Sequence, residues 1–151
     1  MNVNKERLLI LNEHWSKLTE SILTLHKSID KARPLLRKDS FSFEEQETID
    51  SLTLKFNRSS DLYTQKILRG IWDILHEPFA PFIDTMNEAE KFGIIESAES
   101  LIKIRELRNT IAHEYLPEEL QQIIPEVIVL SGQLQENINQ TAGFLKQRGW
   151  L

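Results

Sequence analysis

The spacing of apolar side chains is the feature that most constrains the fold of this 151-residue chain. Near the N-terminus these side chains recur three or four positions apart, which is the spacing of one face of an amphipathic α-helix. That face comprises Leu8, Leu11, Trp15, Leu18, Ile22, Leu25 and Ile29. We predict that this first helix ends before Pro34 and, because the same spacing returns along most of the chain, that the protein is all-α.

A second long helix is predicted to begin after Ser42, because Ser42 and Glu45 have the spacing of a capping box. Pro78 is predicted to close this segment, and we interpret Gly70 within it as the mark of a close contact with another helix. The side chains predicted to face the core from this helix are Ile49, Leu52, Phe56, Tyr63, Ile67 and Leu75.

The second half of the chain is divided by glycine and proline. A turn at residues 78–81 leads into a short helix over residues 82–92 that is stopped by Gly93, and a further helix is predicted over residues 97–114. Pro117 can open the next helix, and Pro125 is expected to force either a kink or a fresh helix start.

A last helical stretch completes the predicted architecture, with core positions Val127, Leu130, Leu134, Ile138 and Leu145. The β-branched run at residues 123–129 is not read as a strand, because the sequence offers it no partner strand. We therefore predict an up-and-down helical bundle with a short extra helix before the helix at residues 97–114.

Length and cysteine content limit the classes of protein to consider. A chain of 151 residues forms one domain with a real hydrophobic core, and we treat residues 1–151 as a single domain. Without cysteine there is no disulfide and no thiolate zinc site. The apolar stretch at residues 8–11 is too short for a signal peptide core or a membrane span, so we expect a soluble cytoplasmic protein with no membrane partner.

The net charge of -5 provides no overall attraction to nucleic acid, so any contact with RNA must depend on local basic clusters. Three clusters are present: Lys31, Arg33, Arg37 and Lys38; Lys55, Arg58, Lys66 and Arg69; and Lys103, Arg105 and Arg108. The first is interpreted as solvated helix surface. Arg105 and Arg108 are candidates for binding the phosphates of a substrate, because they adjoin the segment with the most chemical meaning.

That segment is residues 108–115, with the sequence RNTIAHEY. Arg108 has a permanent charge and a planar fork of donors that fits phosphate oxygens, and His113 gives or takes a proton near neutral pH. Together with the phenol of Tyr115, these are the groups that metal-free phosphodiester chemistry requires. On a regular helix the apolar sector comprises Leu101, Ile104, Leu107, Ile111 and Ala112. Arg108 falls inside that sector, so it needs an ionic partner, a wet cleft or a subunit interface.

Arg108 and His113 do not share a face of a regular helix. Five residues at roughly 100° each separate their side chains by about 140°, whereas Tyr115 returns to the sector of Arg108. Helix termination near Pro117, a bent arginine side chain or a second subunit is required to bring Arg108 and His113 together. This geometry indicates a site shared by two chains.

Three stretches of the chain resemble one protein family. NEAEKFGII at residues 87–95, IRELRN at 104–109 and AHEY at 112–115 are similar to the HEPN superfamily, specifically to the HepT-like toxins that pair with MNT-type minimal nucleotidyltransferases. The family motif is Arg, four residues, His, one residue, Tyr, and Arg108, His113 and Tyr115 match it without a gap. The resemblance runs from about residue 49 to residue 145, and the first forty residues resemble the family only as another helix.

The resemblance implies a HEPN-like bundle that forms a homodimer, in which two copies of the motif line one cleft. It implies a metal-independent endoribonuclease toxin of a type VII-like HEPN/MNT toxin-antitoxin pair, with RNA as the substrate and no cofactor. Arg108 and His113 are then the catalytic residues. His113 acts as base toward the ribose 2′-hydroxyl or as acid toward the leaving oxygen, and Arg108 stabilises the charge that builds on the phosphate.

Supporting roles follow for two further residues. Asn109 is expected to orient His113 or to hydrogen-bond the scissile phosphate. Asp61, in a stretch that resembles the family pattern Arg58-x-x-Asp61, is a candidate ion-pair partner for Arg108.

Tyr115 is implied by the resemblance to be the residue to which the nucleotidyltransferase antitoxin attaches AMP, which silences the site. From the residues alone, it is also an amphipathic core residue whose hydroxyl reaches solvent.

Other interpretations stay open. One is a non-catalytic substrate-binding or regulatory partner of a minimal nucleotidyltransferase, although a pure docking module has no need of the His113 imidazole. Another is that Arg108 only ties helices together through Asp61 or another carboxylate. The sequence has no Gly-rich phosphate loop, so the chain is not predicted to be the nucleotidyltransferase itself. The other histidines lack the spacing of metal ligands, and no metal site is predicted.

Overall fold

A computed structural model describes residues 4–78, 80–113 and 119–151, and every regular element in these residues is helical. The elements are α1 (Lys5–Ala32), α2 (Phe43–Asp61), α3 (Arg69–Leu75), α4 (Phe82–Lys91), α5 (Ala98–Ala112) and α6 (Leu120–Gln147), with a 3₁₀ helix η1 (Arg33–Arg37) and a π-helical segment η2 (Leu62–Leu68). The predicted all-α bundle is confirmed, as is the short extra helix α4. No helix of the described residues has the length and apolar character needed to cross a membrane.

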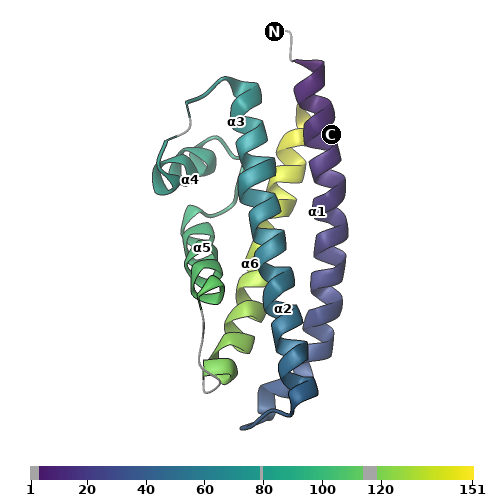
Figure 1. The fold of residues 1–151 in the computed structure, drawn as a ribbon. Coiled ribbons are helices and arrows are strands. Elements are labelled where there is room, and N and C mark those ends of the chain that lie inside the picture. The colour runs from purple at the N-terminus through teal and green to yellow at the C-terminus, as the bar shows by residue number, and fades with distance from the viewer. Residues whose placement is uncertain (1–3, 79, 114–118) are drawn as a thin grey trace.

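The longer helices run alternately in opposite directions along the bundle, and the short α4 lies across them (Figure 1). The first, α1, lies against the continuous segment formed by α2, η2 and α3, which returns toward the end where α1 begins. In turn, α5 packs on α2, α4 and α6, and α6 carries the C-terminus back beside the start of α1. The helix that carries Arg108, α5, therefore lies on one side of the long helices.

Local signals set the helix boundaries. The predicted capping box is confirmed, because the Ser42 N–H donates to Glu45 Oε1 at 2.9 Å and the Glu45 N–H donates to Ser42 Oγ at 3.2 Å. Gly93 follows α4 with a φ of 74°, a left-handed conformation that glycine adopts without a Cβ clash. Phe79, within the predicted turn, and Pro117 lie outside the described residues.

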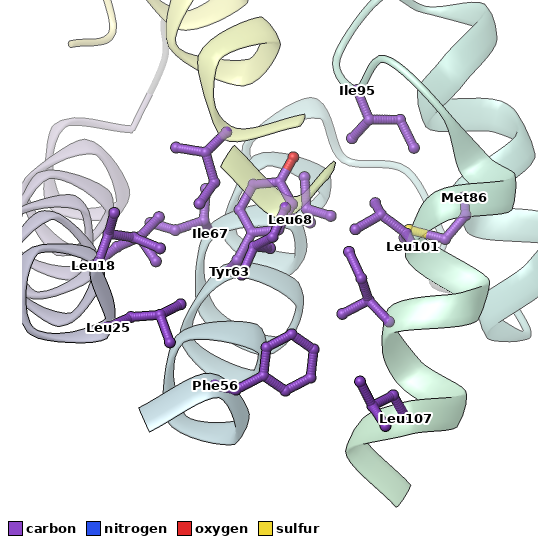
Figure 2. Close-up of a cluster of buried hydrophobic side chains, with 14 of the residues drawn as sticks. Leu18, Leu25, Phe56, Tyr63, Ile67, Leu68, Met86, Ile95, Leu101 and Leu107 are labelled. Atoms are coloured by element: carbon purple, nitrogen blue, oxygen red, sulfur yellow. The ribbon is translucent and has the colours of Figure 1, made fainter. Parts of the chain in front are cut away.

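The core is built from the apolar faces that the periodicity predicts, and Figure 2 shows its centre between α1, the second helix and α5. The predicted core residues of the first two helices are buried, except for Leu8, Trp15 and Leu75, which are partly buried against the core. Gly70 faces α1, and a Cβ at this position would lie 3.5 Å from Leu11 Cδ1. This is an ordinary van der Waals distance, so the helix contact at Gly70 is made with α1 but has room for a Cβ.

Two features of the long helices differ from expectation. Residues 62–68 are π-helical, although their apolar spacing alone predicts a regular α-helix. In α6 the helix continues through Pro125 from a start at Leu120, so of the two alternatives for Pro125, a kink or a fresh helix start, the fresh start is wrong. Pro125 lies within the first two turns of α6, where its missing N–H removes only one intrahelical hydrogen bond. Residues 123–129 are helical, which confirms that they are not a strand.

Candidate functional site

The motif helix α5 is fixed by its apolar face. Ser97 caps it, because Ser97 Oγ accepts a hydrogen bond from the Ser100 N–H at 3.1 Å. Leu101, Ile104 and Leu107 are buried, and Figure 2 shows Leu101 and Leu107 pointing inward from α5. The buried apolar sector of α5 is narrower than predicted, because Ile111 is only half-buried and Ala112 is exposed. The last turn of α5 therefore lies at the edge of the core.

Arg108 lies at this edge and forms an ion pair with Asp61 of α2. Its Nε donates to Asp61 Oδ1 and its Nη2 to Asp61 Oδ2, both at 2.9 Å. Each side chain is about one-third exposed, at 32% and 33%. The hydrogen bonds to Asp61 raise the pKa of Arg108 above its ordinary value. The arginine in the apolar sector has thus found the partner that the sequence suggested, and the carboxylate fixes the direction of the guanidinium plane.

A cavity of about 420 Å³ opens beside this ion pair, between the second helix, α4 and α5. Phe82 and Met86 of α4 contribute to its apolar part. Its polar wall includes Ser60, Asp61, Thr64, Gln65, Arg69, Arg105, Arg108 and Asn109. Three of the proposed site residues of α5 therefore meet Asp61 around a single cavity. An arginine held in place beside an open, partly polar cavity is suited to binding a phosphate or a carboxylate.

Arg105 is positioned by an aromatic ring as well as by its helix. Its guanidinium carbon lies 4.5 Å from the centroid of the Phe82 ring, which is a cation-π contact. Because Arg105 is exposed and lines the cavity, this contact leaves its charge accessible to a ligand there.

His113 is separate from these residues. The motif helix ends at Ala112, so the predicted helix end at residue 114 was too late. His113 follows the helix and has an extended backbone, with φ -87° and ψ 153°. Its N–H donates to the Asn109 carbonyl at 3.2 Å, and its side chain is exposed and is not part of the cavity wall. The contact between Asn109 and His113 that the structure records is thus made by the backbone. Tyr115 lies outside the described residues.

Asn57 of α2 adds a polar group beneath the end of α5. Its Nδ2 donates to the Arg108 carbonyl at 3.4 Å, while its Oδ1 is buried without a hydrogen-bond partner. A long hydrogen bond and an unpaired buried oxygen contribute little to holding this end of the helix.

A buried polar network holds the other end of α5. Asn137 Oδ1 accepts from the backbone N–H groups of Glu96 and Ser97, both at 3.0 Å, and Asn137 Nδ2 donates to Ser100 Oγ at 2.8 Å. Thr141 Oγ1 donates to the Ile94 carbonyl at 2.7 Å. The loop before α5 is therefore bound to α6 by side chains that are themselves buried.

Several of these residues were missed from the sequence. Gln65, Arg69 and Phe82 line the cavity but were given no role, and Asn137 was not recognised as an anchor. A signal was present, because Asp61, Gln65 and Arg69 are spaced by four and so lie on one face of a helix. The periodicity of one helix does not reveal which other helix that face meets, and this information was needed to find the cavity.

Comparison of the chain with protein-family models, with curated proteins and with solved structures found no match. Among the described residues, no group of three or more His, Asp or Glu side chains lies in an arrangement that could hold a metal ion.

Proposed function

We propose that this protein is a metal-independent endoribonuclease toxin of the HEPN/MNT type, acting in the cytoplasm on RNA. The observation that carries the proposal is the guanidinium of Arg108, which Asp61 holds at 2.9 Å beside a cavity that Arg69 and Arg105 also line. A net charge of -5 makes such a concentration of arginines distinctive. The match of Arg108, His113 and Tyr115 to the HEPN motif supplies the reaction type.

In the proposed reaction, the ribose 2′-hydroxyl attacks the adjacent phosphorus. The bond from O2′ to phosphorus forms, the bond from phosphorus to O5′ breaks, and the products end in a 2′,3′-cyclic phosphate and a 5′-hydroxyl. His113 takes the proton from O2′ or gives one to O5′, and Arg108 stabilises the charge on the phosphate oxygens. An internal nucleophile of this kind makes RNA, and not DNA, the substrate.

The separation of His113 from the cavity supports a homodimer. His113 is exposed beyond the end of α5 and does not line the cavity that contains Arg108 of the same chain. A second copy provides the arrangement in which Arg108 and His113 residues of two chains act on one phosphate. Mixing two inactive variants tests this arrangement. A heterodimer of one Arg108→Gln chain and one His113→Ala chain should regain ribonuclease activity if each site uses residues of both chains.

The proposed regulation is transfer of AMP to Tyr115 by a cognate nucleotidyltransferase antitoxin. The chain has two tyrosines, and Tyr63 is fully buried with 0% exposure. After incubation with the antitoxin and ATP, mass spectrometry should therefore find adenylyl mass on Tyr115. Tyr63→Phe should gain this mass as the wild type does, and a Tyr115→Phe protein that gains it would contradict the assignment.

A second candidate function is a non-catalytic partner of a minimal nucleotidyltransferase. The same separation of His113 from the cavity favours it, because in a single chain the cavity can bind an anionic group but has no imidazole beside it. Expression separates the two functions, since a toxin should slow growth when produced alone and be relieved by its antitoxin, whereas a binding partner should be harmless.

The decisive experiment compares wild-type protein, His113→Ala and His26→Ala on labelled RNA in excess EDTA. His26 is an exposed histidine of α1 and provides a matched control. Cleavage by the wild type and His26→Ala, but not by His113→Ala, is the expected result. If no variant cleaves while a sizing column shows an intact dimer, the binding-partner function is favoured.

A further inference from the structure

A second basic cavity lies next to the first and shares part of its wall. It has a volume of about 220 Å³ and lies between α1 and the helical segment that contains η2 and α3. Gln65 and Arg69 line both cavities. The two cavities are therefore neighbours on either side of these two side chains, and we refer to the surface that passes from one cavity to the other as the path.

The charges along this path are mainly positive. Arg7, Lys66 and Arg69 line the second cavity together with the single acidic side chain Asp73. Arg69, Arg105 and Arg108 line the first, where the single carboxylate, Asp61, is already bound by Arg108. In a protein of net charge -5, five cations along two adjoining cavities form a local basic surface.

The behaviour of His14 is consistent with a positive field in the second cavity. This half-buried residue of α1 lines the cavity, and burial, followed by the nearby Lys66 and Lys17, lowers the pKa of its imidazole. Lys66 and Lys17 disfavour the charged imidazolium because they make the potential at His14 more positive. The same positive potential would attract an anion.

The helix between the cavities has an irregular geometry. Segment η2 is π-helical over Leu62–Leu68, and it contributes Gln65 to both cavities and Lys66 to the second. π-Helical turns are rare and occur often at functional sites. Asp61 and Arg69 lie on either side of the whole π-helical segment, so the path is longer than the space around a single phosphate group.

We propose that the second cavity is a binding subsite for the phosphate backbone of single-stranded RNA, which continues the substrate path from Arg108 across Arg69 to Lys66 and Arg7. The identity of the ligand rests on the proposed ribonuclease function. The subsite gives the enzyme affinity for a strand that extends beyond the cleaved bond, and it contains no group that takes part in the reaction.

The test uses binding and not cleavage, so that it does not depend on catalysis. A fluorescent 2′-O-methyl RNA of twelve nucleotides has no free 2′-hydroxyl and stays intact, and its affinity is measured by anisotropy over a range of salt concentrations. Lys66→Gln and the double variant Arg7→Gln/Lys66→Gln are compared with the wild type. Lys31→Gln/Arg37→Gln, in the last turn of α1 and in the following η1, is the matched control for the loss of two charges.

Each lost phosphate contact should reduce the slope of log affinity against log salt by about 0.7. We expect a reduction of about 0.7 for Lys66→Gln and about 1.4 for the double variant, with weaker binding in both and no change in the control. Arg7 also donates to the Asp73 carbonyl at 2.6 Å, so the single Lys66→Gln variant keeps the test valid if the double variant is unstable.

The outcomes separate this inference from the proposed function. If the wild type cleaves RNA in EDTA but Lys66→Gln binds as the wild type does, the proposed subsite is contradicted and the proposed ribonuclease function is supported. If Lys66→Gln binds more weakly but the wild type does not cleave, the subsite stands in a protein that only binds RNA. Equal weakening in the Lys31→Gln/Arg37→Gln control would show a general charge effect and would overturn the subsite.

Discussion

The two ends of α5 are held in different ways. At its start, the buried Asn137 and Thr141 of α6 bind the backbone of residues 94–97 through hydrogen bonds of 2.7–3.0 Å. At its end, one ion pair between partly exposed side chains and one long hydrogen bond from Asn57 connect the helix to α2. The start therefore contributes stability, while the end leaves charged groups accessible for binding.

This difference separates the residues that hold the fold from those proposed to act on RNA. Changes at the start of α5 should alter the free energy of unfolding strongly, and changes at its end should alter that energy little. The predictions that follow test this separation, beginning with the largest expected effect.

Replacing Asn137 with alanine should destabilise the protein by about 3 kcal/mol, because the partly buried N–H groups of Glu96 and Ser97 lose their acceptor and the buried Ser100 Oγ loses a donor. Urea unfolding followed by circular dichroism measures the change. The exposed Asn139 of the same helix is a matched control, and Asn139→Ala should change stability by less than about 0.5 kcal/mol. Equal effects of the two substitutions would show that the network does not anchor α5.

The same network should make stability depend on alkaline pH. Tyr63 is fully buried, and burial raises the pKa of its hydroxyl above the ordinary value of 10.0, although the hydrogen bond with Thr141 opposes this change. A group whose pKa is raised by folding contributes stability that is complete below its unfolded pKa and is lost as pH rises above it. Between pH 9 and pH 11 the wild type should therefore lose about 1.4 kcal/mol that Tyr63→Phe does not lose.

Tyr63→Phe should itself be about 1 kcal/mol less stable at neutral pH, because it removes the hydroxyl that lies 2.7 Å from Thr141 Oγ1. Denaturant unfolding of both proteins from pH 8 to pH 11 gives the comparison. Parallel curves for the two proteins would contradict the assignment of this pH dependence to Tyr63.

At the end of α5, Asp61→Asn should lower stability by only about 1 kcal/mol, because solvent screens an ion pair whose side chains are one-third exposed. The loss should shrink in 1 M salt. Glu99→Gln, which breaks a more exposed ion pair with Lys103 on the same helix, is the control and should have almost no effect. A loss as large as that of Asn137→Ala would mean that the ion pair is mainly structural.

His113→Ala should have the smallest effect on folding, below about 0.5 kcal/mol, because the side chain is exposed at the end of α5. Thermal unfolding measures it. The same substitution is expected to abolish RNA cleavage. A His113→Ala protein that loses stability as well as cleavage would contradict the claim that the end of α5 acts on RNA without holding the fold.

Much of the fold follows from local signals in the sequence. The apolar spacing of α1 and α2, the Ser42 capping box and Gly93 each act within one or two helical turns, so their consequences are readable from the chain. The need of Arg108 for a partner was also predicted, because a charge within an apolar sector requires one, and the family resemblance pointed to Asp61 as that partner.

Other features depend on contacts between distant segments and were not readable. The cavity exists because the face with Gln65 and Arg69 meets α4 and α5, and no local pattern specifies that meeting. The π-helical segment has the same apolar spacing as its α-helical neighbours, so periodicity does not distinguish it. The end of α5 at Ala112 was predicted two residues too late, since boundaries depend on the contacts beyond the helix.

The measurement that tests the central claim most directly is end-group analysis of RNA cleaved in excess EDTA. A labelled RNA is compared with the same RNA carrying a single 2′-deoxy substitution on the 5′ side of the cleaved bond. The account predicts products with a 2′,3′-cyclic phosphate and a 5′-hydroxyl from the first RNA, and no cleavage at that bond in the second. Cleavage of the 2′-deoxy bond, or products with a 5′-phosphate, would contradict it.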